Sequence, residues 1–557
     1  MSAGSRRRRT KDAPPQAVGA TSRARPSLLR APQLQAVPRG GRVALIAAGI
    51  ALLALYALTT SDAVLLEDDG LFLMSSATLG VSHPPGYPVH TVLGWLSTFV
   101  PVSTIAYRVH LLSGLLGALA CMTMGWLVAR RTGSGIAGAI SAVVLGTSEH
   151  FWSQAILAEV YTLNALICLG VYALSVEANE HPTGPAAPRA AAGFGLGLAT
   201  HWPLLLLSSP LIVPQIVVRF RDWWRRAGLL IALIGASAIV PYAWMVWRSN
   251  QDPAISFYGP LETWRDVVFY VSRRGYSAVE TSATATMTDS WQFAFHTARE
   301  LVTTLTPAGT ALACVGVWVQ WRRGWRGVLL GEAAAVLAST VVLAFLLRFD
   351  YDFLKVAVFR PYPLVAYAIV AIWLGIGVAW LVEQSAARGR AIGVAGLVAA
   401  ALLPVALVAR NLPTNNRASD RFAEDHARLL LELVEPNGVL FVYGDTDTGP
   451  VGYLHEVAGL RPDVSLFNLQ GLVFRNRLMP ALSSVATRQQ RVDAFLNATN
   501  RPVFHMTENI VPPRAGDAHL GFLRRIGVSG PVEPPRPEFR RSSDEFFRRL
   551  ASMPTPT

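Results

Sequence analysis

Long apolar runs alternate with short polar segments over the first three quarters of the chain. The first run, 43–60, has the length that an α-helix needs to cross a hydrocarbon core of about 30 Å. Further runs follow at 106–129, 134–148, 153–176, 191–201, 203–218, 227–247, 301–320, 328–347, 361–382 and 392–410. The pattern predicts a membrane all-α bundle with about 11 transmembrane helices.

Two of these runs, 191–201 and 203–218, are short for a full span and meet at His201. A single helix over both would move the cluster Arg219 to Arg226 to the outer side and spoil the alternation of charged loops. We therefore predict a broken pair of helices whose corner points outward. Irregular backbone at membrane depth is tolerated only where protein or a water-filled cavity surrounds it, so the corner is expected to face a cavity.

The composition supports a membrane protein. Hydrophobic residues make up 52% of the chain and charged residues 15%, and the mean hydropathy is +0.36, which excludes an ordinary soluble protein. The net charge of +13 would suggest nucleic acid in a soluble protein, but the positive-inside rule explains it here, so no nucleic-acid partner is expected.

The arginines also give the orientation. Every loop that the alternation assigns to the cytoplasm is basic, through Arg130 and Arg131, Arg189, Arg219 to Arg226, Arg322 to Arg326, and Arg388 and Arg390. The N-terminus is therefore expected in the cytoplasm. Lys11 and Lys355 are the only lysines, and this bias toward arginine is typical of a GC-rich bacterial genome. We expect a protein integral to the bacterial cytoplasmic (inner) membrane.

Four parts follow along the chain. Residues 1–42 are expected to form a disordered basic cytoplasmic tail. Residues 43–410 form the transmembrane domain, with an active-site outer loop at 61–105. A C-terminal extracytoplasmic α/β domain is predicted over 411–530, and a loosely ordered tail rich in Pro and Arg over 531–557.

The α/β domain is predicted from its order of strand, turn, helix and strand. Apolar strands at 439–443 and 464–469 flank the turn Gly444 to Pro450 and a helix. A polar Gly-rich turn after a strand lies at the carboxyl edge, where such sheets bind ligands. Asp445 and Asp447 are therefore a candidate ligand loop.

Candidate chemistry begins in the outer loop with three consecutive carboxylates, Glu67, Asp68 and Asp69. Transfer of a group to a hydroxyl needs a general base, and a carboxylate just outside the membrane is suited to that role. The structural alternative is a helix N-cap before the apolar run that follows. Either Asp68 or Asp69 can provide that cap while the other acts as the base, and both are expected in the active site, with Asp69 among its lining residues.

Other polar groups are expected at the same outer end. His83 and Tyr87 lie in a stiff His-Pro-Pro-Gly-Tyr-Pro turn, where a purely structural histidine is the alternative. Glu159 and Tyr161 lie near the outer end of their run, where a carboxylate is costly unless it is paired or faces water. His201 lies at the broken corner. The topology brings these residues toward one outer cavity as its lining.

Two outer segments carry positive charge against the positive-inside rule. The first, 248–300, contains Arg248, Arg265, Arg273 and Arg274. In the second, Arg348, Lys355 and Arg360 would bind the phosphate of a lipid-linked donor. The alternative is that these cations pair with acidic residues of the same segments.

Cysteine usage adds no further site. Cys121, Cys168 and Cys314 lie inside apolar runs without metal-type spacing, so neither a disulfide nor a cysteine metal site is expected. The motifs indicate no cofactor, and a divalent metal ion beside the loop carboxylates stays an open alternative.

These motifs resemble a large family of bacterial membrane proteins whose eukaryotic relatives are transmembrane protein O-mannosyltransferases. The resemblance is carried by Asp-Asp-Gly-x-Phe at 68–72, His-Pro-Pro-Gly-Tyr-Pro at 83–88, Ala-Glu-Val-Tyr-Thr-Leu-Asn at 158–164, Gly-Leu-Gly-Leu-Ala-Thr-His-Trp at 195–202, Gly-Asp-Thr-Asp-Thr at 444–448, Tyr-Leu-His-Glu-Val at 453–457 and Arg-Pro-Asp-Val at 461–464. It covers most of residues 43–470. It implies a GT-C fold, a polyprenyl-phosphate sugar donor used on the outer face, inverting transfer, and a loop aspartate at the position of Asp68. By that resemblance Asp68 is the base, and Asp69 is expected to cap the helix. The family usually has Glu where this chain has Leu71, and often Gln at the position of His455.

The sequence therefore predicts a membrane glycosyltransferase. It would move a hexose, with mannose as the first choice, from a polyprenyl-phosphate donor to a hydroxyl of an extracytoplasmic protein or glycan acceptor within membrane lipid. One alternative is a transporter or flippase for lipid-linked sugars, which should show internal repeats and functional groups near the bilayer midplane. Another is a non-catalytic scaffold of an envelope-assembly complex.

Overall fold

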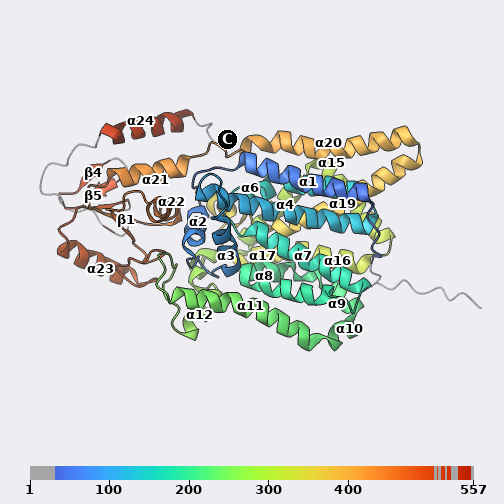
Figure 1. The fold of residues 1–557 in the computed structure, drawn as a ribbon, viewed down its shortest axis with the longest axis horizontal. Helices are drawn as coiled ribbons and strands as arrows, with labels where there is room; N and C mark the ends of the chain where they lie inside the picture. Colours follow the sequence, from blue (N-terminus) through green and yellow to red (C-terminus); the bar gives the residue numbers. More distant parts are fainter. Residues whose placement is uncertain (1–31, 507–510, 512–515, 521–522, 528–536, 553–557) are drawn as a thin grey trace, which may run out of the picture.

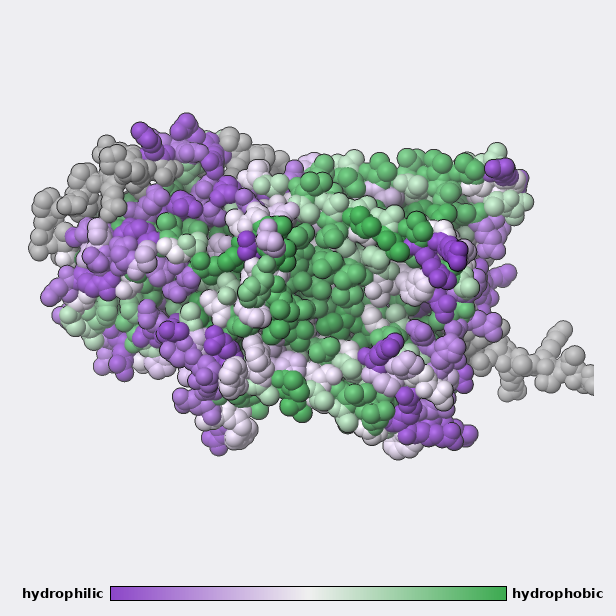
Figure 2. All heavy atoms as spheres, viewed as in Figure 1, coloured by the Kyte–Doolittle hydropathy of each residue, from purple (hydrophilic) through white to green (hydrophobic). Residues whose placement is uncertain are grey.

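The computed structural model describes residues 32–506, 511, 516–520, 523–527 and 537–552. A bundle of long helices carries a smaller α/β domain at one end (Figure 1). Apolar side chains cover the flank of the bundle in Figure 2, whereas the α/β domain and the opposite end of the bundle are largely hydrophilic. We call the two ends of the bundle the domain end and the basic end.

Long helices build the bundle. They are α1 (Arg39–Thr59), α4 (Ile105–Thr132), α5 (Gly135–Gly146), α7 (Tyr161–Glu180), α8 (Ala186–Ser208), α11 (Ala227–Ser249), α14 (Met287–Thr304), α15 (Thr306–Arg322), α16 (Arg326–Leu337), α17 (Leu343–Leu347), α19 (Leu364–Ala387) and α20 (Arg390–Asn415). A π-helical turn, η3 (Ala338–Val342), joins α16 to α17. Short helices connect them: α2 (Asp69–Thr78), α3 (Pro88–Ser97), α6 (Glu149–Gln154), η1 (Ser209–Leu211), α9 (Val213–Val218), α10 (Phe220–Arg225), α12 (Trp264–Val271), η2 (Arg274–Tyr276), α13 (Ser277–Glu280) and α18 (Phe353–Phe359).

The bundle makes this chain an integral membrane protein. Within the described residues, eight helices are long and apolar enough to cross a membrane, or up to nine if the bent pair α14 and α15 is one span. The predicted apolar runs are mainly helical, although residues 155–160 of the run 153–176 are not, and the predicted membrane bundle with a C-terminal α/β domain is confirmed. The count falls below 11 because α5 has only 12 residues and because the two short runs around His201 form one stretch, Ala186–Leu211.

The stretch around His201 is a helical hairpin, as predicted. His201 has non-helical φ and ψ of −135° and 77°. A Cβ on Gly197 would lie 2.9 Å from Cδ1 of Leu205, although eight residues of continuous helix would separate them by about 12 Å. Past the hairpin, Arg219 donates hydrogen bonds to the carbonyl oxygen of Asn179 at the end of α7. The corner therefore points to the domain end, and the chain returns to the basic end.

Small residues let the helices pack closely in the core of the bundle. Alanines such as Ala118, Ala120, Ala366 and Ala371 on α4 and α19 are buried in the main core cluster. Without a hydrophobic driving force between helices in lipid, such small side chains allow the close contacts that hold spans together. Helices α4, α7 and α19 consequently form the centre of the bundle.

The α/β domain has a five-stranded sheet in the order β2-β1-β3-β5-β4. The strands are β1 (Val439–Val442), β2 (Ser465–Asn468), β3 (Val503–His505), β4 (Ala518–Leu520) and β5 (Leu523–Arg525), and the helices are α21 (Phe422–Leu433), α22 (Asp445–Gly452), η4 (Tyr453–Val457), α23 (Val485–Ala498) and α24 (Pro537–Ser552). Strand β1 pairs in parallel with both β2 and β3. The two predicted strands therefore lie side by side, and the loop after β1 is at the carboxyl edge.

The ends of the chain differ from the predicted tails where the structure describes them. Most of the predicted N-terminal tail, 1–31, lies outside the described residues, but α1 already begins at Arg39. The predicted loose ordering over 531–557 is wrong for α24, because Phe546 on this helix is buried against Phe422. An amphipathic helix that finds an apolar partner is ordered by that burial. Residues 531–536 and 553–557 lie outside the described part.

Candidate active site

The outer loop that carries the three carboxylates lies at the domain end, where it leads into α2. Asp68 directly precedes α2, and its Oδ2 lies 3.3 Å from Nε2 of His83. The Asp68 side chain is 34% exposed, so a substrate can reach it. Burial alone would raise the pKa of Asp68, but His83 and Arg273 stabilise the carboxylate and hold its pKa below the usual value. The structure thus keeps an ionised, accessible carboxylate at the position of the predicted base.

Asp69 has the opposite surroundings. It is fully buried, and its carboxylate accepts hydrogen bonds of 2.8 Å from the backbone N–H groups of Leu65 and Ala158, and lies 2.8 Å from Nε2 of His110. The prediction that Asp69 caps a helix is wrong, because its carboxylate instead ties the loop to Ala158. Asp68 occupies the N-cap position of α2 but makes no side-chain cap hydrogen bond, which leaves its carboxylate for other partners.

The His-Pro-Pro-Gly-Tyr-Pro turn forms a wall of aromatic rings beside Asp68. The imidazole of His83 packs edge-on against Phe72 at 5.1 Å and against Tyr87 at 5.0 Å between ring centroids. Tyr87 has a left-handed backbone with φ of 45° and is almost completely buried. Packing on both sides of His83 fixes the orientation of its ring toward Asp68.

Arg273 belongs to the site although it was not among our candidate site residues. It follows α12, with φ of 59°, and is only 8% exposed. Its guanidinium donates to the carbonyl oxygen of Pro84 at 2.9 Å, to the hydroxyl of Tyr87 at 3.1 Å, and to Glu280 at 2.5 Å. The signal in the sequence was its positive charge in an outer segment, which did not distinguish it from its neighbours Arg265 and Arg274.

Glu159 and His201 lie on the bundle side of the site. Glu159 is 5% exposed, and burial together with the charge of Asp68 raises its pKa well above the usual value. His201 is buried, and neither of its ring nitrogens has a hydrogen-bond partner in the described part of the chain. The rings of Tyr87 and Tyr161 lie 5.8 and 6.0 Å from it. The structure therefore brings the predicted lining residues together around the corner of the α8 hairpin.

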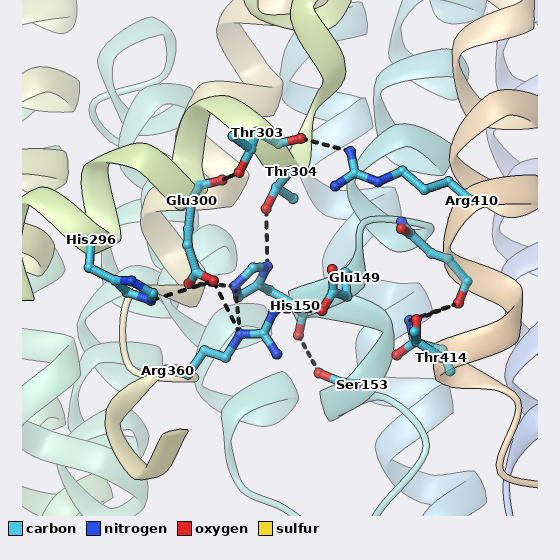
Figure 3. Close-up of polar contacts among 12 residues, drawn as sticks. Glu149, His150, Ser153, His296, Glu300, Thr303, Thr304, Arg360, Arg410 and Thr414 are labelled. Carbon is cyan, nitrogen blue, oxygen red and sulfur yellow. Dashed lines mark hydrogen bonds and ion pairs between the residues drawn. The ribbon is translucent and has the colours of Figure 1, made fainter. Parts of the chain in front are cut away.

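The predicted donor-phosphate residues lie elsewhere at the domain end. Arg360 donates to Glu149 at 2.6 Å and to Nε2 of His150 at 3.0 Å, and it lies 3.5 Å from Glu300 (Figure 3). Arg360 is thus largely neutralised by Glu149 and Glu300, although not by Asp350 or Asp352 of its own segment as the alternative expected, and its side chain is still 38% exposed. Burial raises the pKa of Glu67 in the outer loop, and the positive charge of Arg360 opposes that rise, which links Arg360 electrostatically to the loop.

The other two cations are on the segment before Arg360. Arg348 ends α17 with φ of 38° and is exposed. Lys355 lies on α18, where the neighbouring Phe353 and Leu354 are 89% and 69% exposed. Large apolar side chains this exposed on a membrane protein face lipid. Lys355 therefore lies beside an exposed apolar surface.

The candidate ligand loop of the α/β domain reaches Asp68. Asp445 begins α22, and burial, together with the negative charge of Asp68, raises the pKa of Asp445 to about 6. Burial also raises the pKa of Asp447 to about 6. A Cβ on Gly70, two residues after Asp68, would lie 2.3 Å from the carbonyl carbon of Gly449, so α2 and α22 touch backbone to backbone. Asp445 is one turn before that contact.

Metal binding would require several His, Cys, Asp or Glu side chains that lie close together. In the ranges that the structure describes, no group of three or more His, Cys, Asp or Glu residues is placed to hold a metal ion. His455 bonds to Glu456 and to the backbone of Val464, inside the α/β domain.

Comparisons with known proteins match both parts of the chain. The family model "Protein O-mannosyl-transferase TMEM260 N-terminal domain" matches residues 68–226, and "TMEM260-associated domain 2" matches 423–474. Protein O-mannosyl-transferase TMEM260 from Mus musculus is 28% identical over 446 residues, which are 76% of this chain and 62% of that protein. The protein of the same name from Dictyostelium discoideum is 22% identical over 468 residues, 75% of this chain and 56% of that protein. The chain spans about three fifths of the length of these relatives.

Solved structures share the fold at low sequence identity. The crystal structure of ArnT from Cupriavidus metallidurans bound to undecaprenyl phosphate has a TM-score of 0.56 and 13% identity, covering 87% of this chain and 97% of that one. The same protein in the apo state has a TM-score of 0.55 and 13% identity, covering 84% and 93%.

Proposed function

Because the chain is a TMEM260-related protein with the GT-C fold, we propose that it is a membrane glycosyltransferase. It transfers a hexose, with mannose as the first candidate, from a polyprenyl phosphate to a hydroxyl of an extracytoplasmic protein or glycan. The names of its relatives support O-mannosyl transfer, and the undecaprenyl phosphate bound to ArnT supports a lipid-linked donor.

The observation that carries the proposal is the contrast between the two neighbouring aspartates. Protein donors satisfy the buried carboxylate of Asp69, whereas Asp68 is accessible, ionised and oriented by His83. In the proposed step, Asp68 takes the proton of the acceptor hydroxyl while the acceptor oxygen bonds to the anomeric carbon. The bond from that carbon to the phosphate oxygen breaks, the polyprenyl phosphate leaves with the electron pair, and the anomeric configuration inverts.

The leaving phosphate needs positive charge. Arg273 supplies it beside Asp68, because its fork of N–H donors already faces the hydroxyl of Tyr87 and, at 3.4 Å, that of Tyr362. We retain Arg360, Lys355 and Arg348 as the cations that the donor phosphate meets on its way in. Exposed apolar side chains on α18 would bring the polyprenyl chain alongside them.

The remaining residues shape the site. Glu159, with its raised pKa, is the candidate to stay protonated and donate a hydrogen bond to the sugar. His201 and Tyr161 line the bundle side. The positive-inside rule supports an orientation with the basic end in the cytoplasm of a bacterial cell and the α/β domain outside the cytoplasmic membrane.

The test is Asp68→Asn in membranes supplied with a radiolabelled polyprenyl-phosphate mannose and a peptide that contains Ser and Thr. Loss of the base should lower transfer by about 10²- to 10⁴-fold, because that is the usual contribution of general base catalysis. Glu383→Gln is the matched control, since Glu383 forms an exposed ion pair with Arg323 at the basic end. Normal transfer by a correctly inserted Asp68→Asn protein would remove Asp68 as the base, and no transfer by the wild type would remove the proposed activity.

A further inference from the structure

The α/β domain is fixed against the bundle by several independent contacts. Residues 80–82, 254–257 and 473–475 form a ribbon through the bridges Val81 to Ser256 and Ile255 to Phe474. Its backbone hydrogen bonds include Phe257 to Val81 and Ser256 to Val473, so segments of both parts pair directly. Val81 of this ribbon lies two residues before His83, whose imidazole contacts the carboxylate of Asp68.

Further contacts close the junction around the site. The backbone N–H of Ala106 donates to the hydroxyl of Tyr453 at 3.2 Å, and Arg421 pairs with Asp62 at 2.8 Å. Together with the backbone contact between Gly70 and Gly449, these bonds set the position of α22 relative to α2. These contacts therefore hold the start of α22 beside the loop that carries Asp68.

Asp445 is the polar group that α22 presents there. It follows β1, whose two parallel neighbours lie on opposite sides, and ligands usually bind outside the carboxyl ends of strands at such a switch point. Among the residues that the structure describes, none bonds to the Asp445 carboxylate, and the residue keeps part of its surface exposed although its surroundings partly desolvate the carboxylate. Asp445 lies one turn before Gly449, which touches Gly70, and Asp68 lies two residues before Gly70, so the two carboxylates belong to the same junction between α2 and α22.

We propose that the α/β domain completes the acceptor site of the enzyme, with the Asp445 carboxylate accepting a hydrogen bond from a polypeptide acceptor and so positioning its hydroxyl against Asp68. The inference rests on the proposed glycosyl transfer. An ionised carboxylate accepts hydrogen bonds only, and a polypeptide offers N–H donors along its backbone beside the Ser or Thr hydroxyl. Asp68 removes the proton of the acceptor hydroxyl, and Asp445 binds the acceptor polypeptide that carries this hydroxyl.

The variant Asp445→Asn tests this role, with Asp493→Asn on α23 as the matched control on a remote face of the same domain. The probes are undecaprenyl-phospho-mannose and a synthetic peptide that contains Ser and Thr. Loss of one charge-assisted hydrogen bond should raise the KM for the peptide about tenfold or more. Binding of undecaprenyl phosphate, measured separately, should not change, and Asp445→Glu should recover part of the lost affinity.

The pH profile gives a second readout. Because the pKa of Asp445 is raised to about 6, its carboxylate is ionised above that pH and gains a proton as the pH falls through it. The KM of the wild type for the peptide should therefore rise below pH 6, and this rise should be absent in Asp445→Asn. An unchanged KM and pH profile in Asp445→Asn beside an active wild type would overturn the inference alone. An inactive wild type would overturn the proposed function and this inference with it.

Discussion

Two polar clusters lie at opposite ends of the bundle, and they differ in what satisfies them. At the basic end, Glu332 accepts from Arg131 at 2.6 Å, from the hydroxyl of Tyr172 at 2.7 Å and from the indole of Trp373 at 2.7 Å. Arg131 and Glu332 are completely buried. Four helices, α4, α7, α16 and α19, meet in this cluster, and protein groups satisfy its carboxylate.

The cluster at the domain end is open by comparison. Asp68 is partly exposed, both ring nitrogens of His201 lack partners in the described chain, and Asp445 has no partner there. Both ring nitrogens of His90 on α3 also lack partners among the described residues, and its ring lies 5.0 Å from that of Phe72. A buried polar atom without a partner costs about 1–3 kcal/mol, so a fold keeps such groups where a ligand or water completes them. The difference indicates that clusters whose polar groups are paired by other protein groups, here called closed, stabilise the bundle. Clusters that leave polar groups without protein partners, here called open, serve its chemistry.

The largest effect should come from opening the closed cluster. Glu332→Ala leaves the charge of Arg131 buried without a counter-charge, which should lower the free energy of unfolding by about 3–5 kcal/mol. Thermal unfolding of the purified protein in detergent, followed by circular dichroism, measures the loss. The double variant Arg131→Met with Glu332→Leu removes both charges and should recover most of the stability. A double variant no more stable than Glu332→Ala would show that the charge is not the cause.

A substitution in the open cluster should lower activity more than stability. Arg273→Ala in the open cluster removes the cation beside Asp68 and the bonds to the Pro84 turn, and should lower transfer about 100-fold through the loss of charge-assisted hydrogen bonds. The melting temperature should fall less than in Glu332→Ala. Arg273→Lys keeps the charge but loses the fork of donors, so it should recover only part of the activity. Equal activity in Arg273→Ala and the wild type would break the comparison.

The sequence predicted the segments of this fold better than the pairing of their side chains. Apolar runs have the length of spans, so the bundle and the hairpin at His201 could be read from hydropathy and charge. Arg131 was interpreted as a loop residue, because nothing local shows that it turns into the core toward Glu332, 201 residues away. Arg273 was missed as a site residue for the same reason, since its partners at Pro84 and Tyr87 come from another outer loop.

The neighbouring aspartates show the same limit. Motif resemblance selected Asp68, and local helix rules then assigned Asp69 as a cap. The bonds of Asp69 to Ala158 and His110 join segments that only the folded bundle brings together. In the same way, the ligand loop at Asp445 followed from the strand and turn pattern, but its position beside Asp68 depends on how the domain docks.

Arg360 gives the smallest and sharpest prediction, because its cluster is at the domain end and yet is closed by carboxylates (Figure 3). If a cluster whose charges are paired by protein groups is structural, Arg360→Gln should mainly lower the free energy of unfolding. The loss should be about 1 kcal/mol, since the guanidinium is partly exposed and its ion pairs are screened by solvent. The KM for the polyprenyl-phosphate donor should rise about threefold, because a screened attraction between Arg360 and the donor phosphate is worth less than a direct hydrogen bond. Thermal unfolding and donor titration on the same preparation measure both, with Arg323→Gln at the basic end as the control. A rise in the donor KM of about 100-fold, as large as the loss of transfer expected for Arg273→Ala, would instead make Arg360 the main phosphate ligand. The location of a cluster at the domain end would then decide its role, whether or not protein groups pair its charges.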